Sequence, residues 1–137
     1  MRTKAQVGIE YIIIFGFLTF ILITIMSIAF FYSSGIKDRL KTAQVNNYAN
    51  KIIATSETVF YYGNPSKATI RVYLPEGIQN IEFHTEGLII ETQLNSGISR
   101  SLYSTNIQLQ GNLSNSPGIQ NVEIIAQDDR VLLSTMV

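Results

Sequence analysis

Glu10 is the residue whose type and position most clearly suggest chemistry. It is the first acidic residue of the chain and the last charged residue before a long apolar run that begins at Tyr11. An ionised carboxylate in hydrocarbon costs about 2.5–3.5 kcal/mol on insertion scales, so an acid at this depth needs a partner or a purpose. The alternative is that Glu10 lies hydrated at the level of the lipid headgroups.

Other reactive side chains are few. The absence of cysteine excludes disulfides, thiol nucleophiles and cysteine-based zinc sites, and His84 is the single histidine. The sequence has no glycine-rich phosphate loop, no H-E-x-x-H and no G-x-S-x-G. Asp128 and Asp129 lack the acidic spacing of a calcium loop and predict a hairpin turn instead. We therefore expect no enzyme, no catalytic or metal site and no cofactor.

Asn112 is a candidate modification site. With Leu113 and Ser114 it forms an N-glycosylation sequon, which we expect in an exposed loop. Its use requires that this part of the chain lies outside the cell. The same triplet often arises by chance.

A long apolar run follows Glu10. Residues 11–36 carry no charge, and residues 11–32 are almost entirely apolar. As a helix, this 22-residue stretch would be about 33 Å long, enough for the ~30 Å hydrocarbon core of a bilayer. A buried helix of a soluble protein would show a polar face, and this run has none. The run therefore predicts a membrane-inserting helix, although the flanking charges alone leave its orientation open.

The residues before the apolar run carry a processing signal. A short basic leader, residues 1–5, is followed by a small-residue junction at Ala5-Gln6, with Glu10 five residues past Ala5. The stretch Lys4-Ala5-Gln6-Val7-Gly8-Ile9-Glu10-Tyr11 resembles the class III signal peptide of archaeal type IV pilins and related surface proteins. The family often has serine at the position of Gly8, which is a mild departure.

The resemblance has consequences for processing and assembly. It implies that a prepilin-type peptidase cuts between Ala5 and Gln6, that Glu10 is the family's glutamate at the fifth mature position, and that the precursor keeps its N-terminus in the cytoplasm. The cut would create an ammonium group on Gln6, which could pair with Glu10 of a staggered neighbour. At ~4 Å and an effective dielectric constant of ~20, that attraction is about 4 kcal/mol before desolvation is subtracted.

We expect the helix to continue past the apolar run, over residues 6–62. Residues 6–32 would form the transmembrane or filament-core part, and residues 37–62 an amphipathic stalk. From Val45 on, apolar residues recur at spacings of three and four, which is typical of a helix with one buried stripe. Gly63 and Pro65 then provide a stop signal.

Residues 63–137 read as a small β domain. Turn signals recur every 8–12 residues, beginning with Pro75-Glu76-Gly77. The strands expected between them cover residues 70–74, 81–83, 88–94, 99–104, 107–110, 122–124 and 131–134. The chain is thus predicted to be α+β, with a long N-terminal hydrophobic helix followed by a small antiparallel β-sandwich, loosely immunoglobulin-like. Such a short domain has little core of its own, so the stripe on the preceding helix should complete it.

The net charge of the chain is zero, but the charges are distributed unevenly along it. Residues 1–36 sum to +1, residues 37–62 to +2 (four basic, two acidic) and residues 63–137 to −3 (four basic, seven acidic). A nucleic-acid-binding domain normally shows a strongly basic balance, so this class is not expected.

Two functional interpretations remain. The chain is either the structural subunit of an archaeal type IV pilus-like surface filament, or a membrane-anchored extracellular β domain that binds a ligand or partner without polymerising. In the first, its partners are copies of itself, the peptidase and the pilus assembly machinery. The precursor would lie in the cell membrane, and the mature chain in an extracellular filament or at the cell surface.

Overall fold

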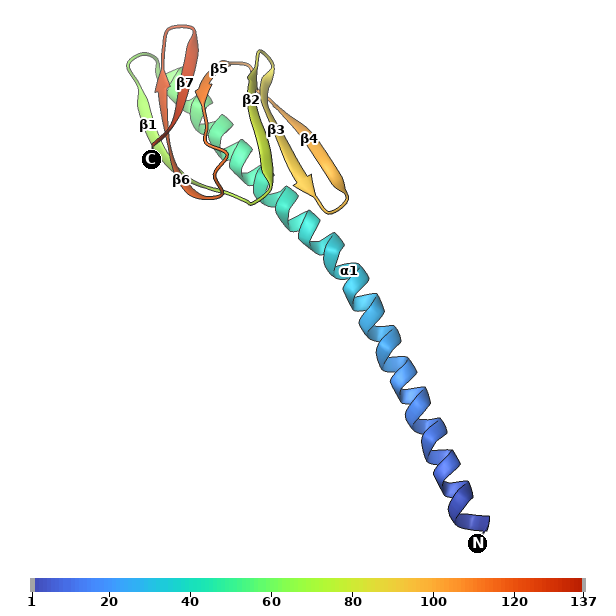
Figure 1. Cartoon of the computed structure of the whole chain (residues 1–137). Helices are drawn as coiled ribbons and strands as arrows, with labels where there is room; N and C mark the ends of the chain where they lie inside the picture. The colour runs from blue at the N-terminus through green and yellow to red at the C-terminus, as the bar shows by residue number, and fades with distance from the viewer. Residues whose placement is uncertain (1, 137) are drawn as a thin grey trace. The chain divides into compact units, whose positions relative to one another are not determined.

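The computed structural model describes residues 2–136, with side chains described from Gly8 onward. One helix, α1 (Arg2–Tyr62), precedes seven strands (Figure 1). The strands are β1 (Lys67–Leu74), β2 (Ile78–His84), β3 (Gly87–Leu94), β4 (Gly97–Ser104), β5 (Gln108–Asn112), β6 (Gly118–Ala126) and β7 (Arg130–Met136). The predicted α+β class, a long apolar helix followed by a small β region, is confirmed.

The chain divides into two compact units, Met1–Lys37 and Asp38–Val137. The boundary falls inside α1, so the part of the helix from Asp38 to Tyr62 belongs with the strands. We call residues 8–37 the apolar segment and Asp38–Val137 the β unit. The helix ends at Tyr62 because Gly63 follows with φ +79°, and its N–H donates to the Phe60 carbonyl at 2.9 Å.

The strands form two sheets that do not close into a barrel. The larger has the order β1-β6-β7-β5, and the smaller has the order β2-β3-β4. Pairing is antiparallel throughout the described strands except between β5 and β7, which run parallel. Strands β2 and β5, which belong to different sheets, lie near each other without backbone pairing. Asn115, in the loop after β5, donates from Nδ2 to the Gln79 carbonyl of β2 at 3.0 Å.

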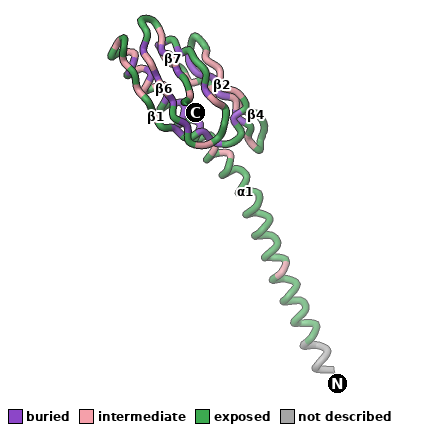
Figure 2. The backbone as a smooth tube through the Cα atoms, turned by 60° about the vertical axis from the view of Figure 1, so that its left-hand side comes forward, coloured by how far each residue is buried: buried purple, intermediate pink, exposed green. Residues whose placement is uncertain are grey.

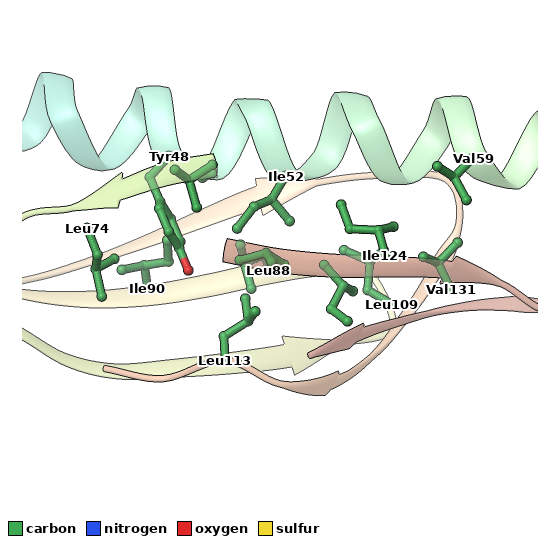
Figure 3. Packing of buried hydrophobic residues seen from close by; sticks show 14 of the residues in the cluster. Tyr48, Ile52, Val59, Leu74, Leu88, Ile90, Leu109, Leu113, Ile124 and Val131 are labelled. Atoms are coloured by element: carbon green, nitrogen blue, oxygen red, sulfur yellow. The ribbon is translucent and has the colours of Figure 1, made fainter. Parts of the chain in front are cut away.

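One hydrophobic core serves the helix and both sheets of the β unit. The helix contributes one buried face, comprising Val45, Tyr48, Ala49, Ile52 and Val59. Beneath it lie inward-facing strand residues, among them Leu74, Leu88, Ile90, Leu109, Ile124 and Val131 (Figure 3). The expectation that the helix completes the core of a small β domain is therefore confirmed.

Polar contacts fix the helix to the turn between β3 and β4. Asp38 Oδ1 accepts hydrogen bonds from the backbone N–H and the side-chain amide of Asn95, both at 3.0 Å, and Oδ2 accepts from the Ser96 N–H at 3.3 Å. One turn further on, Lys41 Nζ donates to the Gln93 carbonyl at 2.9 Å. The backbone hydrogen bond from Asn95 is the main reason that the pKa of Asp38 lies below its usual value.

Candidate membrane-inserting and assembly segment

The residues of the apolar segment are almost all exposed (Figure 2). Phe31 is 81% exposed and Tyr11 71%, whereas large apolar side chains of a folded domain are normally buried. An 18-residue window of this helix has a mean hydropathy of 2.7, and none of the window is buried. The helix is long and apolar enough to cross a bilayer, and it is compatible with membrane anchoring.

Four hydroxyl groups of the apolar segment donate hydrogen bonds within the helix. Thr19, Thr24 and Ser27 each donate to the carbonyl four residues earlier at 2.8 Å, and Ser34 donates to the carbonyl three residues earlier at 3.0 Å. A polar group without a partner in hydrocarbon costs several kcal/mol, so these internal bonds remove the main penalty for contact with lipid tails. The segment thus offers neighbouring molecules an apolar surface in which these four hydroxyl donors are already used.

Glu10 and Gly8 lie on the exposed surface of α1. Glu10 makes no ion pair with any residue whose side chain is described, and a Cβ atom at Gly8 would meet nothing within 4 Å. The other two predicted processing residues, Ala5 and Gln6, lie outside the residues with described side chains. The proposed cut between them and the pairing of Glu10 with the new Gln6 ammonium group therefore stay predictions.

Asn112 is exposed, as a glycan acceptor must be, but its place in the fold differs from the prediction. It is the last residue of β5, at the outer edge of the larger sheet, whereas the sequence predicts a loop there. Leu113 is buried and Ser114 half-buried in the loop that follows. The parallel pairing with β7 draws Asn112 into the strand, opposite Ser134.

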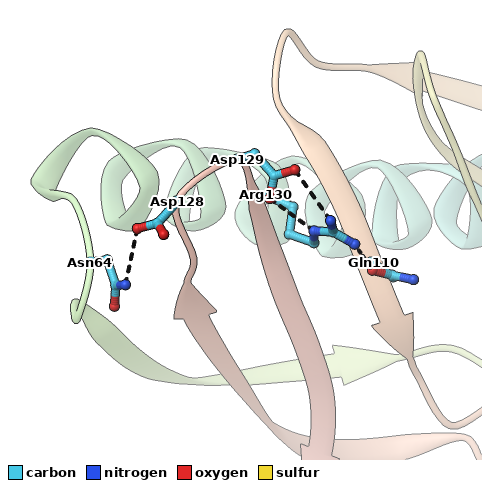
Figure 4. Close-up of polar contacts among 5 residues, drawn as sticks. All are labelled: Asn64, Gln110, Asp128, Asp129 and Arg130. Carbon is cyan, nitrogen blue, oxygen red and sulfur yellow. Dashed lines mark hydrogen bonds and ion pairs between the residues drawn. The ribbon is translucent and has the colours of Figure 1, made fainter.

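The polar residues at the other end of the β unit are structural (Figure 4). Asp128 and Asp129 form the predicted turn between β6 and β7. Asp128 accepts from Asn64 Nδ2 at 3.1 Å, and Arg130 donates to both carboxylate oxygens of Asp129, at 2.9 and 3.2 Å, and to Gln110 Oε1 at 2.9 Å. Within the described residues, no three histidine, aspartate or glutamate side chains gather as metal ligands would.

The β unit also has a groove between α1 and β1, which no sequence pattern predicts. It has a volume of about 330 Å³ and is lined by polar side chains of the helix and by the edge strand β1. Gln44, Asn47, Lys51, Arg71 and Tyr73 define what we call the α1–β1 groove. No local motif marks it, because Lys51 and Arg71 are 20 positions apart in sequence and meet only through the packing of β1 beside the helix.

Comparisons with known proteins add no family to this description. No family model matches the sequence, and neither the curated proteins nor the solved structures contain a match.

Proposed function

We propose that this chain is a structural subunit of an archaeal type IV pilus-like surface filament. It would be made as a membrane-inserted precursor, cut between Ala5 and Gln6 by a prepilin-type peptidase, and polymerised through its N-terminal helix. The observation that carries the proposal is the contrast within α1. Its apolar segment is exposed, while the part in the β unit completes a folded core.

Polymerisation follows from the surface chemistry of the apolar segment. Once such a helix leaves the bilayer, its apolar side chains need another apolar environment, and the same segment of other copies supplies one. Apolar surfaces alone specify register weakly. A charged pair between Glu10 of one copy and the Gln6 ammonium group of another would select one stagger, as a buried polar residue does in a coiled coil.

The β unit would then coat the filament and meet surfaces or other cells. Its placement outside the cell follows from an N-terminus held in the cytoplasm, which the signal-peptide resemblance implies. In that position Asn112 would be open to glycosylation. An adhesive or general pilus is preferred to a motility filament, because motility needs more than this chain displays.

The decisive experiment examines the mature protein and its assemblies together. Surface material sheared from cells should contain filaments that carry this chain, and N-terminal sequencing should begin at Gln6. Electron microscopy with an antibody against the β unit identifies the filaments. An intact Met1, or a start far inside the helix, would refute the pilin interpretation.

The role of Glu10 can be tested separately. Glu10→Ala should leave cleavage and folding of the β unit intact but abolish filament assembly, because the register-setting charge is lost. Glu86→Ala, which removes an exposed carboxylate from the β2–β3 turn, is the matched control and should assemble normally. Filaments of normal abundance from Glu10→Ala would contradict the role assigned to Glu10.

A second candidate function is a membrane-anchored β domain that binds a ligand and never polymerises. The observation that favours it is the α1–β1 groove, a hollow on the β unit lined by both polar and apolar residues. Mature chains that begin at Gln6 but stay in the membrane fraction, with no filaments at the surface, would support this alternative.

A further inference from the structure

The α1–β1 groove lies where the larger sheet ends. Strand β1 is the edge of the order β1-β6-β7-β5, so one side of its backbone is not paired with another strand. Helix α1 runs beside that free side. From the helix, Lys51 Nζ donates a hydrogen bond to the Arg71 carbonyl at 2.9 Å. This contact closes part of the edge and leaves a hollow flanked by side chains of the helix and of the strand.

The α1–β1 groove carries positive charge. Lys51 and Arg71 both line it, and the lining includes no carboxylate. The other basic residues of β1, β4 and β7, which are Lys67, Arg100 and Arg130, each form an ion pair with an acidic side chain. Among the described residues, neither Lys51 nor Arg71 does so. The groove therefore concentrates two uncompensated positive charges on a β domain whose strands and loops are acidic overall.

Its remaining side chains suit a polar ring better than a bare ion. Gln44 and Asn47 lie one helical turn apart, and each carboxamide offers both donors and an acceptor. Among the described residues, neither the Gln44 nor the Asn47 side chain forms a hydrogen bond within the protein. The neighbouring Asn46 does, since it accepts one from Tyr103. Tyr73, at 49% exposure, adds an aromatic surface beside them. The ring of Tyr48 also borders the groove, whereas its hydroxyl points away from α1 into the core (Figure 3).

We propose that the α1–β1 groove binds an acidic sugar, a saccharide ring that carries a carboxylate or sulfate group. The Arg71 guanidinium and the Lys51 ammonium would hold the anionic group, since charge-assisted bonds to oxyanions are the strongest available here. Gln44 and Asn47 would bond the ring hydroxyls, and Tyr73 would contact the apolar face of the ring. The volume of about 330 Å³ is at the lower end of small-molecule sites, which suits one ring at the end of a glycan.

The inference rests on the proposed function only in placing the β unit at the cell surface, where acidic glycans occur. Binding by the purified chain does not require cleavage or polymerisation. A chain that binds the sugar but forms no filaments would therefore refute the filament alone, and filaments without sugar binding would refute the groove alone.

The test uses the full chain in a zwitterionic detergent, because alkyl glycoside detergents would themselves present sugars. Saturation-transfer NMR is recorded with D-glucuronate as the acidic probe and D-glucose as the neutral one, and inorganic sulfate is added as a competitor. We expect transfer to glucuronate, at least tenfold weaker affinity for glucose, and displacement of glucuronate only at sulfate concentrations at least tenfold above that of glucuronate. Arg71→Gln should weaken glucuronate binding at least tenfold.

Arg39→Gln is the matched control, since it makes the same substitution and the same charge change on a residue that does not line the groove. It should bind glucuronate like the original chain. Gln44→Ala provides a second groove variant that removes no charge, and it should weaken glucuronate binding while sparing competition by sulfate. Unfolding followed by near-ultraviolet circular dichroism verifies that each variant is folded.

Three results would overturn the proposal. Absence of transfer to glucuronate would exclude the site, and equal affinities for glucuronate and sulfate would show a general anion site without recognition of the sugar. Equal losses in Arg71→Gln and Arg39→Gln would show that overall charge, and not the groove, attracts the probe.

Discussion

The two parts of helix α1 share one backbone conformation but differ in what their side chains contact. In the apolar segment large hydrophobic residues surround the helix and remain exposed, as with Phe31 at 81%. In the β unit the helix buries a single stripe, with Ala49 and Ile52 at 0% exposure. The distribution of side chains around a helix, and not helicity itself, therefore decides whether it packs on a domain or presents itself to lipid or to other helices.

The largest expected effect comes from the same substitution made in each part. Ile52→Ala should lower the free energy of unfolding of the β unit by about 2–5 kcal/mol, because it leaves a cavity between α1 and the sheets. Ile23→Ala, at a position 58% exposed in the apolar segment, should leave that unfolding transition unchanged. Urea titration of the full chain in detergent, followed by near-ultraviolet circular dichroism of the tyrosines, measures both. A similar loss in Ile23→Ala would contradict the separation of the two parts.

A smaller effect, of opposite sign, is expected at a buried hydroxyl of the β unit. The hydroxyls of Thr19, Thr24 and Ser27 in the apolar segment bond to the helix backbone, but the Tyr48 hydroxyl is buried without a hydrogen-bond partner among the described residues. Burial also raises the pKa of Tyr48. Tyr48→Phe should therefore raise the free energy of unfolding by about 1 kcal/mol, because it removes an unsatisfied polar group and keeps the ring.

Tyr103→Phe is the control for this substitution. The Tyr103 hydroxyl donates to Asn46 Oδ1 at 2.5 Å, so its removal should lower the free energy of unfolding by about 1 kcal/mol. The same denaturant titration compares the two variants. Destabilisation by Tyr48→Phe would mean that the hydroxyl has a partner.

The smallest effect concerns the start of the β unit and depends on pH. The hydrogen bonds from Asn95 lower the pKa of Asp38, so the folded state favours the charged carboxylate. The stabilisation is complete above the pKa of the unfolded chain, about 3.9, and is lost as the pH falls through the lower pKa of the folded state. Asp38→Asn should therefore be less stable than the original chain at neutral pH, and the difference should narrow under acid conditions.

Thermal unfolding from neutral to acid pH checks this dependence. Asp129, whose pKa is lowered by its hydrogen bonds to Arg130, contributes acid sensitivity of its own in both chains. The informative quantity is thus the difference between the two melting temperatures at each pH. A difference that stays constant below about pH 3.9 would show that Asp38 acts through something other than its charge.

Local patterns predicted much of this fold. The uncharged run, the stripe from Val45 and the turn residues indicated the helix and the strands, because each depends on neighbours a few positions away. The choice of which strands pair does not depend on such near neighbours. The parallel contact of β5 with β7 and the pairing of β1 with β6 join segments distant in sequence, and packing decides them. Position 111 illustrates this. A side chain there would place its Cβ 1.9 Å from the Leu133 carbonyl oxygen on the neighbouring strand, so only glycine fits.

Some candidate sites could be predicted from the local sequence, and others depend on tertiary packing. The exposure of the apolar segment and of Glu10 could be anticipated from composition and order along the chain. The strand position of Asn112 could not, because it depends on the partner strand β7. The α1–β1 groove was likewise hidden, since its cations come from a helix and a strand whose contact is tertiary.

The way α1 is embedded in the β unit determines how the unit would carry mechanical load. From Asp38 to Tyr62 the helix lies along the strands, with buried side chains spaced from Val45 to Val59 (Figure 3). Hydrogen bonds to Asp38 hold the first turn of this part of the helix. Near its last turn, Glu57 accepts a hydrogen bond from Thr105 at 2.7 Å. Tension along the helix axis would load these contacts side by side rather than one after another. They would have to yield together, so the β unit would resist a lengthwise pull far better than the peeling of a single strand.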